Sequence, residues 1–148
     1  MDATDFLNLL YVTLKALLKP ALDNRLVRRI YELRVLVLSG EYPNVFSCTG
    51  CGRKEALEDG TDESRVRPHF FSIRHHGLLC PDCIKGEPVI AMDASTLYAM
   101  QYIISAPLRR LYTFTLSGPV FERLEEIISN YIDHYSDHIY KSEDLLKK

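Results

Sequence analysis

The four cysteines of this 148-residue chain fall into two pairs with the same internal spacing. Two residues separate Cys48 from Cys51 and Cys80 from Cys83, and 28 residues lie between the two pairs. Two thiolates at this spacing can hold one metal ion through a tight turn, and a glycine such as Gly50 gives that turn conformational freedom. Two such turns complete a tetrahedral shell of sulfur ligands. The spacing therefore predicts a zinc site whose ligands are Cys48, Cys51, Cys80 and Cys83.

Because four protein ligands leave no coordination position for water, the predicted zinc is structural rather than catalytic. An iron–sulfur cluster on the same thiolates is the alternative that this spacing favours less. A thioredoxin-like redox pair would need a βαβ pattern, which is not found around Cys80. The N-terminal segment starts acidic and has no small-residue cleavage site. We therefore expect an intracellular protein, in which disulfides are rare.

A second group of candidate residues consists of arginines. Arg25, Arg28 and Arg29 are spaced so that they share one helix face. They could contact the phosphates of nucleic acid or an acidic partner. The simpler interpretation is a solvated face that pairs with Asp23 or Glu32.

Two histidines and a smaller basic pair complete the candidates. His134 and His138 lie four residues apart on a predicted helix, so they could chelate a second metal in a metal-dependent enzyme. Their positions border the apolar stripe of that helix, and the simpler interpretation is a pair of histidines at the edge of the core. Arg109 and Arg110 form the basic pair. The sequence shows no Ser–His–Asp order and no glycine-rich phosphate loop, so we expect neither catalysis nor a small-molecule substrate.

Helices are predicted on both sides of the cysteine region. Apolar residues recur at helical spacing over residues 4–19, 23–38 and 94–105, and again in an amphipathic segment of about five or six turns that begins near Ser117. Thr4 or Asp5 could cap the first helix, Asp23 or Asn24 the second, and Asp93 or Ser95 the third. These segments predict a mainly α protein built as a helical bundle.

Residues 41–92 lack helical periodicity and carry the cysteines. Short β-like pieces at 44–47 and 70–73 flank the cysteine pairs, and the charged stretch 53–68 is most simply a solvated loop. We therefore expect a single domain over residues 1–148. Its zinc module, residues 41–92, contains short β-strands and is inserted between helical parts at 4–40 and 93–148.

The first helix is apolar on most of its circumference. One broad stripe includes Phe6, Tyr11 and Leu14, and a second stripe, Leu9–Val12–Ala16, lies on another side. A helix of this kind is usually buried between neighbours. We therefore expect that this helix is central, or that it packs on something outside this chain.

Composition limits the remaining function classes. Hydrophobic residues make up 47% of the chain, enough for a real core. The net charge is −2, which excludes a strongly basic chain but allows a local basic patch. No run of about 18 apolar residues occurs, so we expect no membrane span.

The order of these motifs resembles the C-terminal part of the bacterial recombination mediator RecO. An arginine-rich helix leads into a CxxCG cysteine pair, a Phe-Ser stretch and a glycine turn precede the second pair, and a late helix contains a Lys-Ser dipeptide. The residues that carry this resemblance are Glu32-Leu33-Arg34, Gly40, Pro43, Cys48 to Gly52, Phe71-Ser72, Gly77, Cys80 to Cys83 and Lys141-Ser142.

The match has two departures from the RecO pattern. The usual Gly-Gly of the turn is His76-Gly77 in this chain. RecO proteins also begin with an OB-fold that binds single strands, whereas this chain opens directly on a helix.

The resemblance implies a protein that acts by binding, without a catalytic cycle. RecO binds single-stranded DNA and the protein that coats it, anneals complementary strands, and works with RecR to load RecA in DNA repair. Zinc on the four cysteines would hold the module together. Without the OB-fold we expect weak binding of single-stranded DNA, and we expect a bacterial cytoplasmic, nucleoid-associated location. The alternative is a zinc-stabilised adaptor that binds proteins and does not contact nucleic acid.

Overall fold

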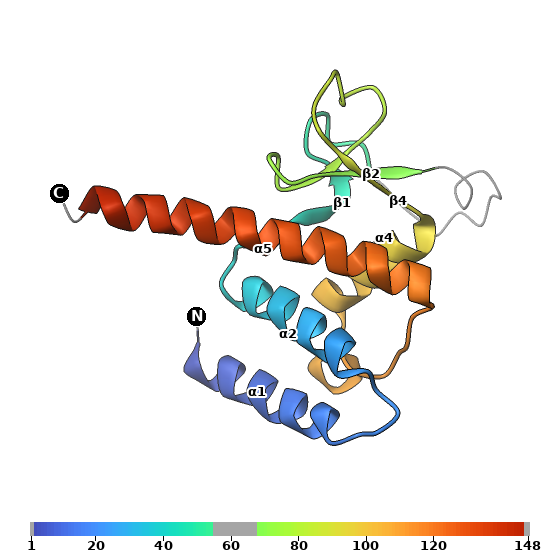
Figure 1. Cartoon of the computed structure of the whole chain (residues 1–148), viewed down its shortest axis with the longest axis vertical. Coiled ribbons are helices and arrows are strands. Elements are labelled where there is room, and N and C mark those ends of the chain that lie inside the picture. Colours follow the sequence, from blue (N-terminus) through green and yellow to red (C-terminus); the bar gives the residue numbers. More distant parts are fainter. Residues whose placement is uncertain (1, 55–67, 147–148) are drawn as a thin grey trace.

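The computed structural model describes residues 2–54 and 68–146, except for the side chains of residues 137–146. The described residues form helices and short strands, and the predicted mainly α fold with an inserted cysteine module is confirmed (Figure 1). The helices are α1 (Ala3–Leu17), α2 (Asn24–Leu38), α4 (Ala94–Ser105), the 3-10 helix η1 (Leu108–Arg110) and α5 (Gly118–Leu146). The strands are β1 (Asn44–Cys48), β2 (His69–Ser72), β3 (Gly77–Leu79) and β4 (Ile90–Met92).

Helix starts follow local capping chemistry. The side chains of Asp23 and Asp93 accept hydrogen bonds from backbone N–H groups at the starts of α2 and α4, as predicted. The predicted cap of α1 is wrong, because the side chain of Asp2 accepts from the N–H of Thr4.

Helix α5 has 29 residues and is longer than the predicted five or six turns. None of the helices in the described residues is long and apolar enough to cross a membrane.

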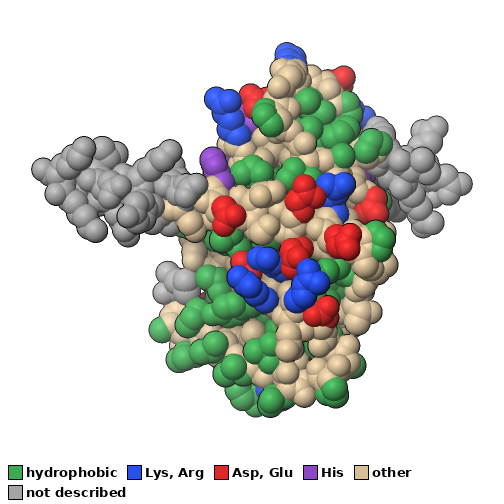
Figure 2. All heavy atoms as spheres, viewed as in Figure 1, with side chains coloured by type: hydrophobic (Ala, Val, Ile, Leu, Met, Phe, Trp, Pro, Cys, Tyr) green, Lys and Arg blue, Asp and Glu red, His purple; other side chains and the backbone are tan. Residues whose placement is uncertain are grey.

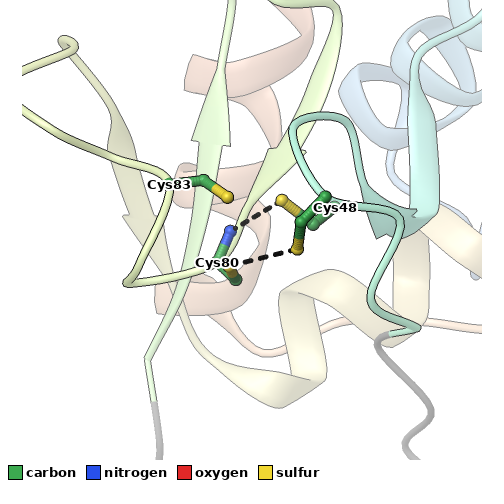
Figure 3. Close-up of side chains that lie close together, drawn as sticks. Cys48, Cys80 and Cys83 are labelled. Carbon is green, nitrogen blue, oxygen red and sulfur yellow. Dashed lines mark hydrogen bonds between the residues drawn. The ribbon is translucent and has the colours of Figure 1, made fainter.

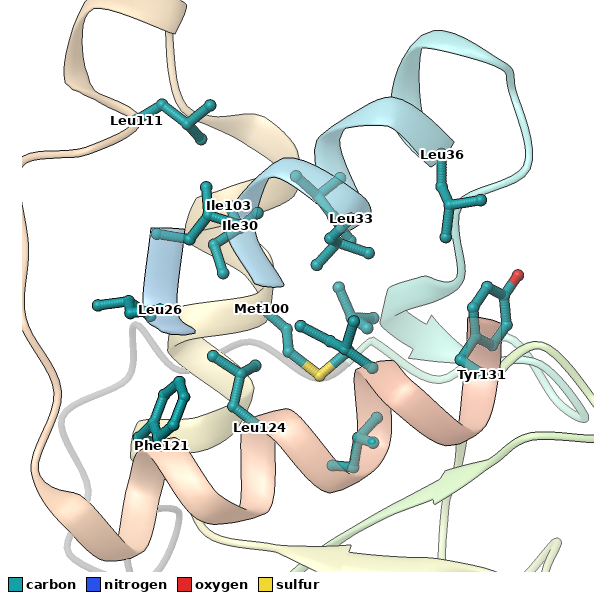
Figure 4. Close-up of a cluster of buried hydrophobic side chains, with 14 of the residues drawn as sticks. Leu26, Ile30, Leu33, Leu36, Met100, Ile103, Leu111, Phe121, Leu124 and Tyr131 are labelled. Carbon is teal, nitrogen blue, oxygen red and sulfur yellow. The ribbon is translucent and has the colours of Figure 1, made fainter. Parts of the chain in front are cut away.

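The core lies where α2, α4 and α5 meet (Figure 4). Leu33 of α2, Met100 of α4 and Leu124 of α5 are each at most 1% exposed. Burial of a side chain of this size stabilises a fold by about 1.5–3 kcal/mol. Leu26, Ile30 and Leu33 recur at helical spacing along α2 and are part of this core, and Val37 is partly buried against it.

A four-stranded sheet packs on the helical core. Its strand order is β1-β3-β2-β4, in which β1 and β3 are parallel while β2 pairs antiparallel with both β3 and β4. Val45, Phe71 and Leu78 belong to the same buried cluster as the helical residues. The Gln101 side chain of α4 donates a hydrogen bond to the carbonyl oxygen of Val45, 2.8 Å away. The cysteine module is therefore continuous with the helical core.

The expectation that the first helix is central is wrong. Helix α1 lies at the outer edge of the bundle, where it packs on α2 and η1 (Figure 1). Its buried residues are Leu9, Thr13 and Ala16, so the second, narrower stripe faces the core. The broader stripe faces outward, and apolar side chains gather over α1 in the space-filling view (Figure 2). The exposed members of this stripe are Leu7, Tyr11, Leu14, Leu17 and Leu18.

The sequence did not predict two of the four strands, β3 and β4. The pieces at 44–47 and 70–73 correspond to β1 and β2, while β3 and β4 are too short to show a periodic pattern. The predicted turn before Gly77 joins β2 to β3. His76 in this turn has a φ of 59°, in the left-handed region that favours glycine. This backbone conformation explains why the RecO pattern has a glycine at the position of His76. Most of the predicted loop at 53–68 lies outside the described residues.

Candidate metal centre

The parallel pairing of β1 and β3 brings the two cysteine pairs to one edge of the sheet. Cys48 is the last residue of β1 and is in register with Leu78, two residues before Cys80. Because parallel strands end at the same edge, the turns that follow them meet there. The thiols of Cys48, Cys80 and Cys83 converge between these two turns (Figure 3).

The four sulfur atoms lie within 4.8 Å of one another. The Cys51 and Cys80 Sγ atoms are 3.7 Å apart, and all four cysteines are free thiols. Zinc–sulfur bonds of about 2.3 Å place the sulfur atoms of a tetrahedral site about 3.8 Å apart. The donor set and its spacing therefore fit a tetrahedral thiolate site, and the four residues predicted from the CxxC spacing are brought together.

Backbone N–H groups turn toward the sulfur of Cys48. The N–H groups of Gly50 and Cys80 each donate to its Sγ at 3.3 Å. Burial by itself raises the pKa of Cys48, but hydrogen bonds from the backbone of Cys80, Cys51 and Gly50 and from the Cys83 thiol together lower the pKa to about 6. A thiolate is the form that binds a metal, so the peptide turns prepare Cys48 for ligation.

Cys83 shows the opposite shift. Hydrogen bonds with the thiols of Cys80 and Cys48 raise the pKa of Cys83 to about 12 in the metal-free chain. Four crowded thiols cannot all ionise together, because each additional negative charge repels those already present. A divalent cation would remove this repulsion, so binding of the metal would be coupled to the release of protons.

Two glycines shape the first cysteine turn. A Cβ on Gly50 would lie 3.0 Å from the Sγ of Cys83, so a larger residue at this position would push the two turns slightly apart. Gly52 has a φ of 80°, in the left-handed region, and its N–H donates to the carbonyl oxygen of Cys48.

The site is partly open to solvent. Cys48 and Cys80 are buried, Cys83 is half-buried and Cys51 is exposed. A small apolar cluster supports the buried pair, formed with Leu79, Ile84 and Val89.

The arginines predicted to share one face of α2 do so, but each has an acidic partner. Arg25 and Arg29 both contact Glu125 of α5, at 2.7 and 3.3 Å. Arg28 and Arg29 both contact Glu32, each at 3.1 Å. Basic and acidic side chains alternate on this face of the molecule (Figure 2). The sequence suggests Glu32 as a partner, whereas Glu125 lies about a hundred residues away in sequence and gives no local signal.

The predicted histidine pair is only partly described. His134 is exposed, and its ring lies 5.9 Å from that of His76, which also lies 5.9 Å from the ring of Tyr131. The side chain of His138 lies outside the described residues. Within the described part of the chain, the group of residues arranged to hold a metal is the four cysteines.

Tyr112 and Tyr98 lie in different surroundings. Tyr112 is buried, and its hydroxyl lies 2.6 Å from that of Thr13. Tyr98 is 60% exposed, and its ring is stacked on that of Tyr102. The first is a core residue, and the second presents an aromatic face to solvent.

Comparison with known proteins identifies the family. The family model described as recombination protein O, C terminal, matches residues 2–144. The DNA repair protein RecO of Symbiobacterium thermophilum is 28% identical over 86% of this chain and 48% of its own length. The RecO proteins of Acetivibrio thermocellus and Halalkalibacterium halodurans are 26% and 27% identical over 96% and 93% of this chain, and over 51% and 50% of their own lengths.

The chain thus spans about half the length of the curated relatives it matches. No solved structure matches it significantly. The family match includes all four cysteines and both helical parts, and it confirms the resemblance seen in the sequence. The chain belongs to the family of recombination protein O C-terminal regions.

Proposed function

We propose that this chain is the helical, zinc-binding C-terminal domain of a bacterial recombination mediator that acts in DNA repair. The proposed protein binds single-stranded DNA, the protein that coats it, and RecR, and it promotes RecA loading and strand annealing without a catalytic cycle. The observation that carries this proposal is the family match over residues 2–144, which encloses a four-cysteine cluster with metal-site spacing. This role would place the protein in the cytoplasm, at the nucleoid.

Zinc is the proposed metal. Four thiolates in a tetrahedral arrangement are the usual ligands of structural zinc, and they leave no open position for a substrate. The ion would tie the end of β1 to the end of β3. It would thereby fix the sheet against α4 and contribute to folding rather than to chemistry.

The arginine face of α2 is the first proposed contact surface. The side chains of Arg25 and Arg28 are 65% and 72% exposed, so their guanidinium groups remain accessible although they are paired. Arg29 is only 15% exposed and holds the two acidic partners in place. A DNA phosphate, or the acidic tail of the coating protein, would compete with Glu32 and Glu125 for the outer two arginines.

Charge reversal tests this surface. We expect that Arg25→Glu combined with Arg28→Glu weakens binding of single-stranded DNA or of an acidic tail peptide, and that it reduces the salt dependence of this binding. Arg123→Glu, an exposed change on α5, is the matched control. Unchanged affinity for both ligands would show that the arginine face is not a binding surface.

A protein–protein adaptor is the second candidate function. The exposed apolar stripe of α1 favours it, because contiguous exposed apolar side chains mark interaction surfaces. An adaptor would capture RecR or another protein with the same affinity after nuclease treatment and at high salt. The mediator proposal instead expects the chain to bind single-stranded DNA, weakly at physiological salt. Absence of DNA binding even at low salt would favour the adaptor.

A further inference from the structure

A basic pocket lies between α1 and η1, away from both the cysteine site and the arginine face. It has a volume of about 270 Å³, and its charged lining consists of Lys15, Lys19 and Arg109. None of these three cations forms an ion pair with another described residue, in contrast to the arginines of α2. The remaining lining residues are Val12, Ala16, Leu108, Tyr112 and Thr113. The pocket therefore offers uncompensated positive charge above an apolar floor.

An aromatic groove adjoins this pocket. It has a volume of about 340 Å³ and is lined by Tyr98 and Tyr102 of α4 and by Phe114 in the segment after η1. The rings of Tyr98 and Tyr102 are stacked, with centroids 6.4 Å apart and planes 29° from parallel. Phe114 meets Tyr102 edge-on at 5.2 Å. Thr113 lines both the groove and the basic pocket, so the two are neighbours.

Hydrogen bonds hold in place the segment 110–113, which lies between the basic pocket and the aromatic groove. The Tyr102 hydroxyl donates to the carbonyl oxygen of Arg110 at 2.9 Å, and the Thr113 hydroxyl donates to the same oxygen at 2.7 Å. Tyr112 is fixed from below by Thr13 of α1. These bonds hold the segments that carry Arg109 and Tyr102 against each other and against α1, while the Lys15 ammonium lies 5.3 Å from the centre of the Tyr11 ring, at the rim of the pocket.

Neighbouring cations and aromatic faces match the chemistry of a single strand of nucleic acid. Phosphates bind Lys and Arg side chains, and unpaired bases stack on exposed aromatic rings. An acidic peptide would use the cations but has no need of a stacked tyrosine pair whose outer member is 60% exposed. The arrangement thus favours nucleic acid over a peptide.

We propose that the basic pocket and the aromatic groove together bind single-stranded nucleic acid, with a phosphate at Lys15, Lys19 and Arg109 and a base on Tyr98. This inference rests on the proposed function, because it names a second surface, besides the arginine face of α2, through which this chain would contact the single strand. Lys15, Lys19, Arg109 and Tyr98 are not among the residues that carry the resemblance to RecO.

The test measures fluorescence anisotropy of a labelled oligothymidylate of about 16 nucleotides, bound to the zinc-loaded chain over a range of salt concentrations. Lys15→Glu combined with Arg109→Glu should weaken binding at least about tenfold, and the salt dependence should fall by about 0.7 in slope for each phosphate that the chain no longer binds. Tyr98→Ala should weaken binding about tenfold with an unchanged slope, and Tyr98→Phe should keep full affinity because the ring is retained.

Matched controls separate these effects from general ones. Tyr42→Ala removes another exposed tyrosine, and Arg123→Glu reverses another exposed charge, so both should bind as the parent chain does. Circular dichroism and zinc content should be the same in all variants. Loss of charge should change the salt dependence of binding, whereas loss of stacking should not. A misfolded variant would not show this difference.

Three results would overturn the proposal. If the parent chain binds DNA and the pocket and groove variants bind equally well, the surface is wrong while the proposed function stands. If the parent chain binds no DNA even at low salt, both fall. If the variants lose affinity for an acidic peptide with a terminal aromatic residue but keep their affinity for DNA, the surface binds a protein partner instead.

Discussion

The hydroxyl groups of Thr13 and Tyr112 lie 2.6 Å apart and join α1 to the segment that follows η1. The Thr13 hydroxyl also lies 2.8 Å from the carbonyl oxygen of Leu9, to which it donates, so the Tyr112 hydroxyl supplies the proton for the bond between them. Both residues are buried. Tyr112 also lines the basic pocket, so this contact holds α1 against the segment after η1 at that pocket.

Tyr112→Phe removes this contact while keeping the ring in the core. We expect a loss of about 1 kcal/mol in the free energy of unfolding, because the buried Thr13 hydroxyl oxygen loses its donor. Denaturant unfolding measures the change. The control is Tyr42→Phe, which removes an exposed hydroxyl and should change stability by less than about 0.5 kcal/mol. Equal effects in the two variants would show that the buried contact has no specific role.

The ion pairs of Glu125 predict a pH-dependent stability. Hydrogen bonding from Arg25 first, and then from Arg29, holds the pKa of Glu125 below its usual value in the folded chain. A carboxyl group with a lowered pKa stabilises the fold above its unfolded pKa, and this contribution is lost as the pH falls through the folded pKa.

Glu125→Gln should therefore lower stability by less than about 1 kcal/mol at neutral pH, because Glu125 is partly solvated. The difference from the parent chain should shrink as the pH falls below the usual pKa of a glutamate, about 4.3, and vanish below the lower pKa of Glu125 in the folded chain. Thermal unfolding at several pH values measures it. A difference that persists unchanged at low pH would show that the charge of Glu125 is not its cause.

The close approach of the two cysteine turns at Gly50 should affect the affinity of the site for zinc. In Gly50→Ala the new methyl group would press against the sulfur of Cys83, so we expect zinc affinity to fall by about tenfold. Competition with a chromogenic chelator measures the affinity. Gly118→Ala is the control, because a Cβ at Gly118 meets no atom within 4 Å and its affinity should be unchanged. Equal affinities for zinc in the two variants would contradict the observed closeness of the two turns.

The sequence predicted those features that depend on local chemistry. The CxxC spacing identified the four residues that converge, and capping residues such as Asp23 and Asp93 marked helix starts within a residue or two. These signals are local, because the residues that produce them are neighbours along the chain.

Long-range relationships carried no such signal. The parallel pairing of β1 with β3, which brings the cysteine turns together, joins short strands about thirty residues apart. Glu125 lies near Arg25 only because α5 packs beside α2. In α1 both stripes are apolar, so periodicity alone could not tell which stripe faces the core. The basic pocket likewise combines two distant segments, and only its Arg109 stands out in the sequence, as part of a basic pair.

The metal content of the purified chain tests the central claim most directly. Elemental analysis should find one zinc per chain, and Cys80→Ser should lose most of it, whereas Thr49→Ser in the first cysteine turn should retain it. Removal of zinc by a chelator should lower the thermal stability of the parent chain. A parent chain without metal, whose four thiols titrate as free and whose stability is unaffected by added zinc, would contradict the account.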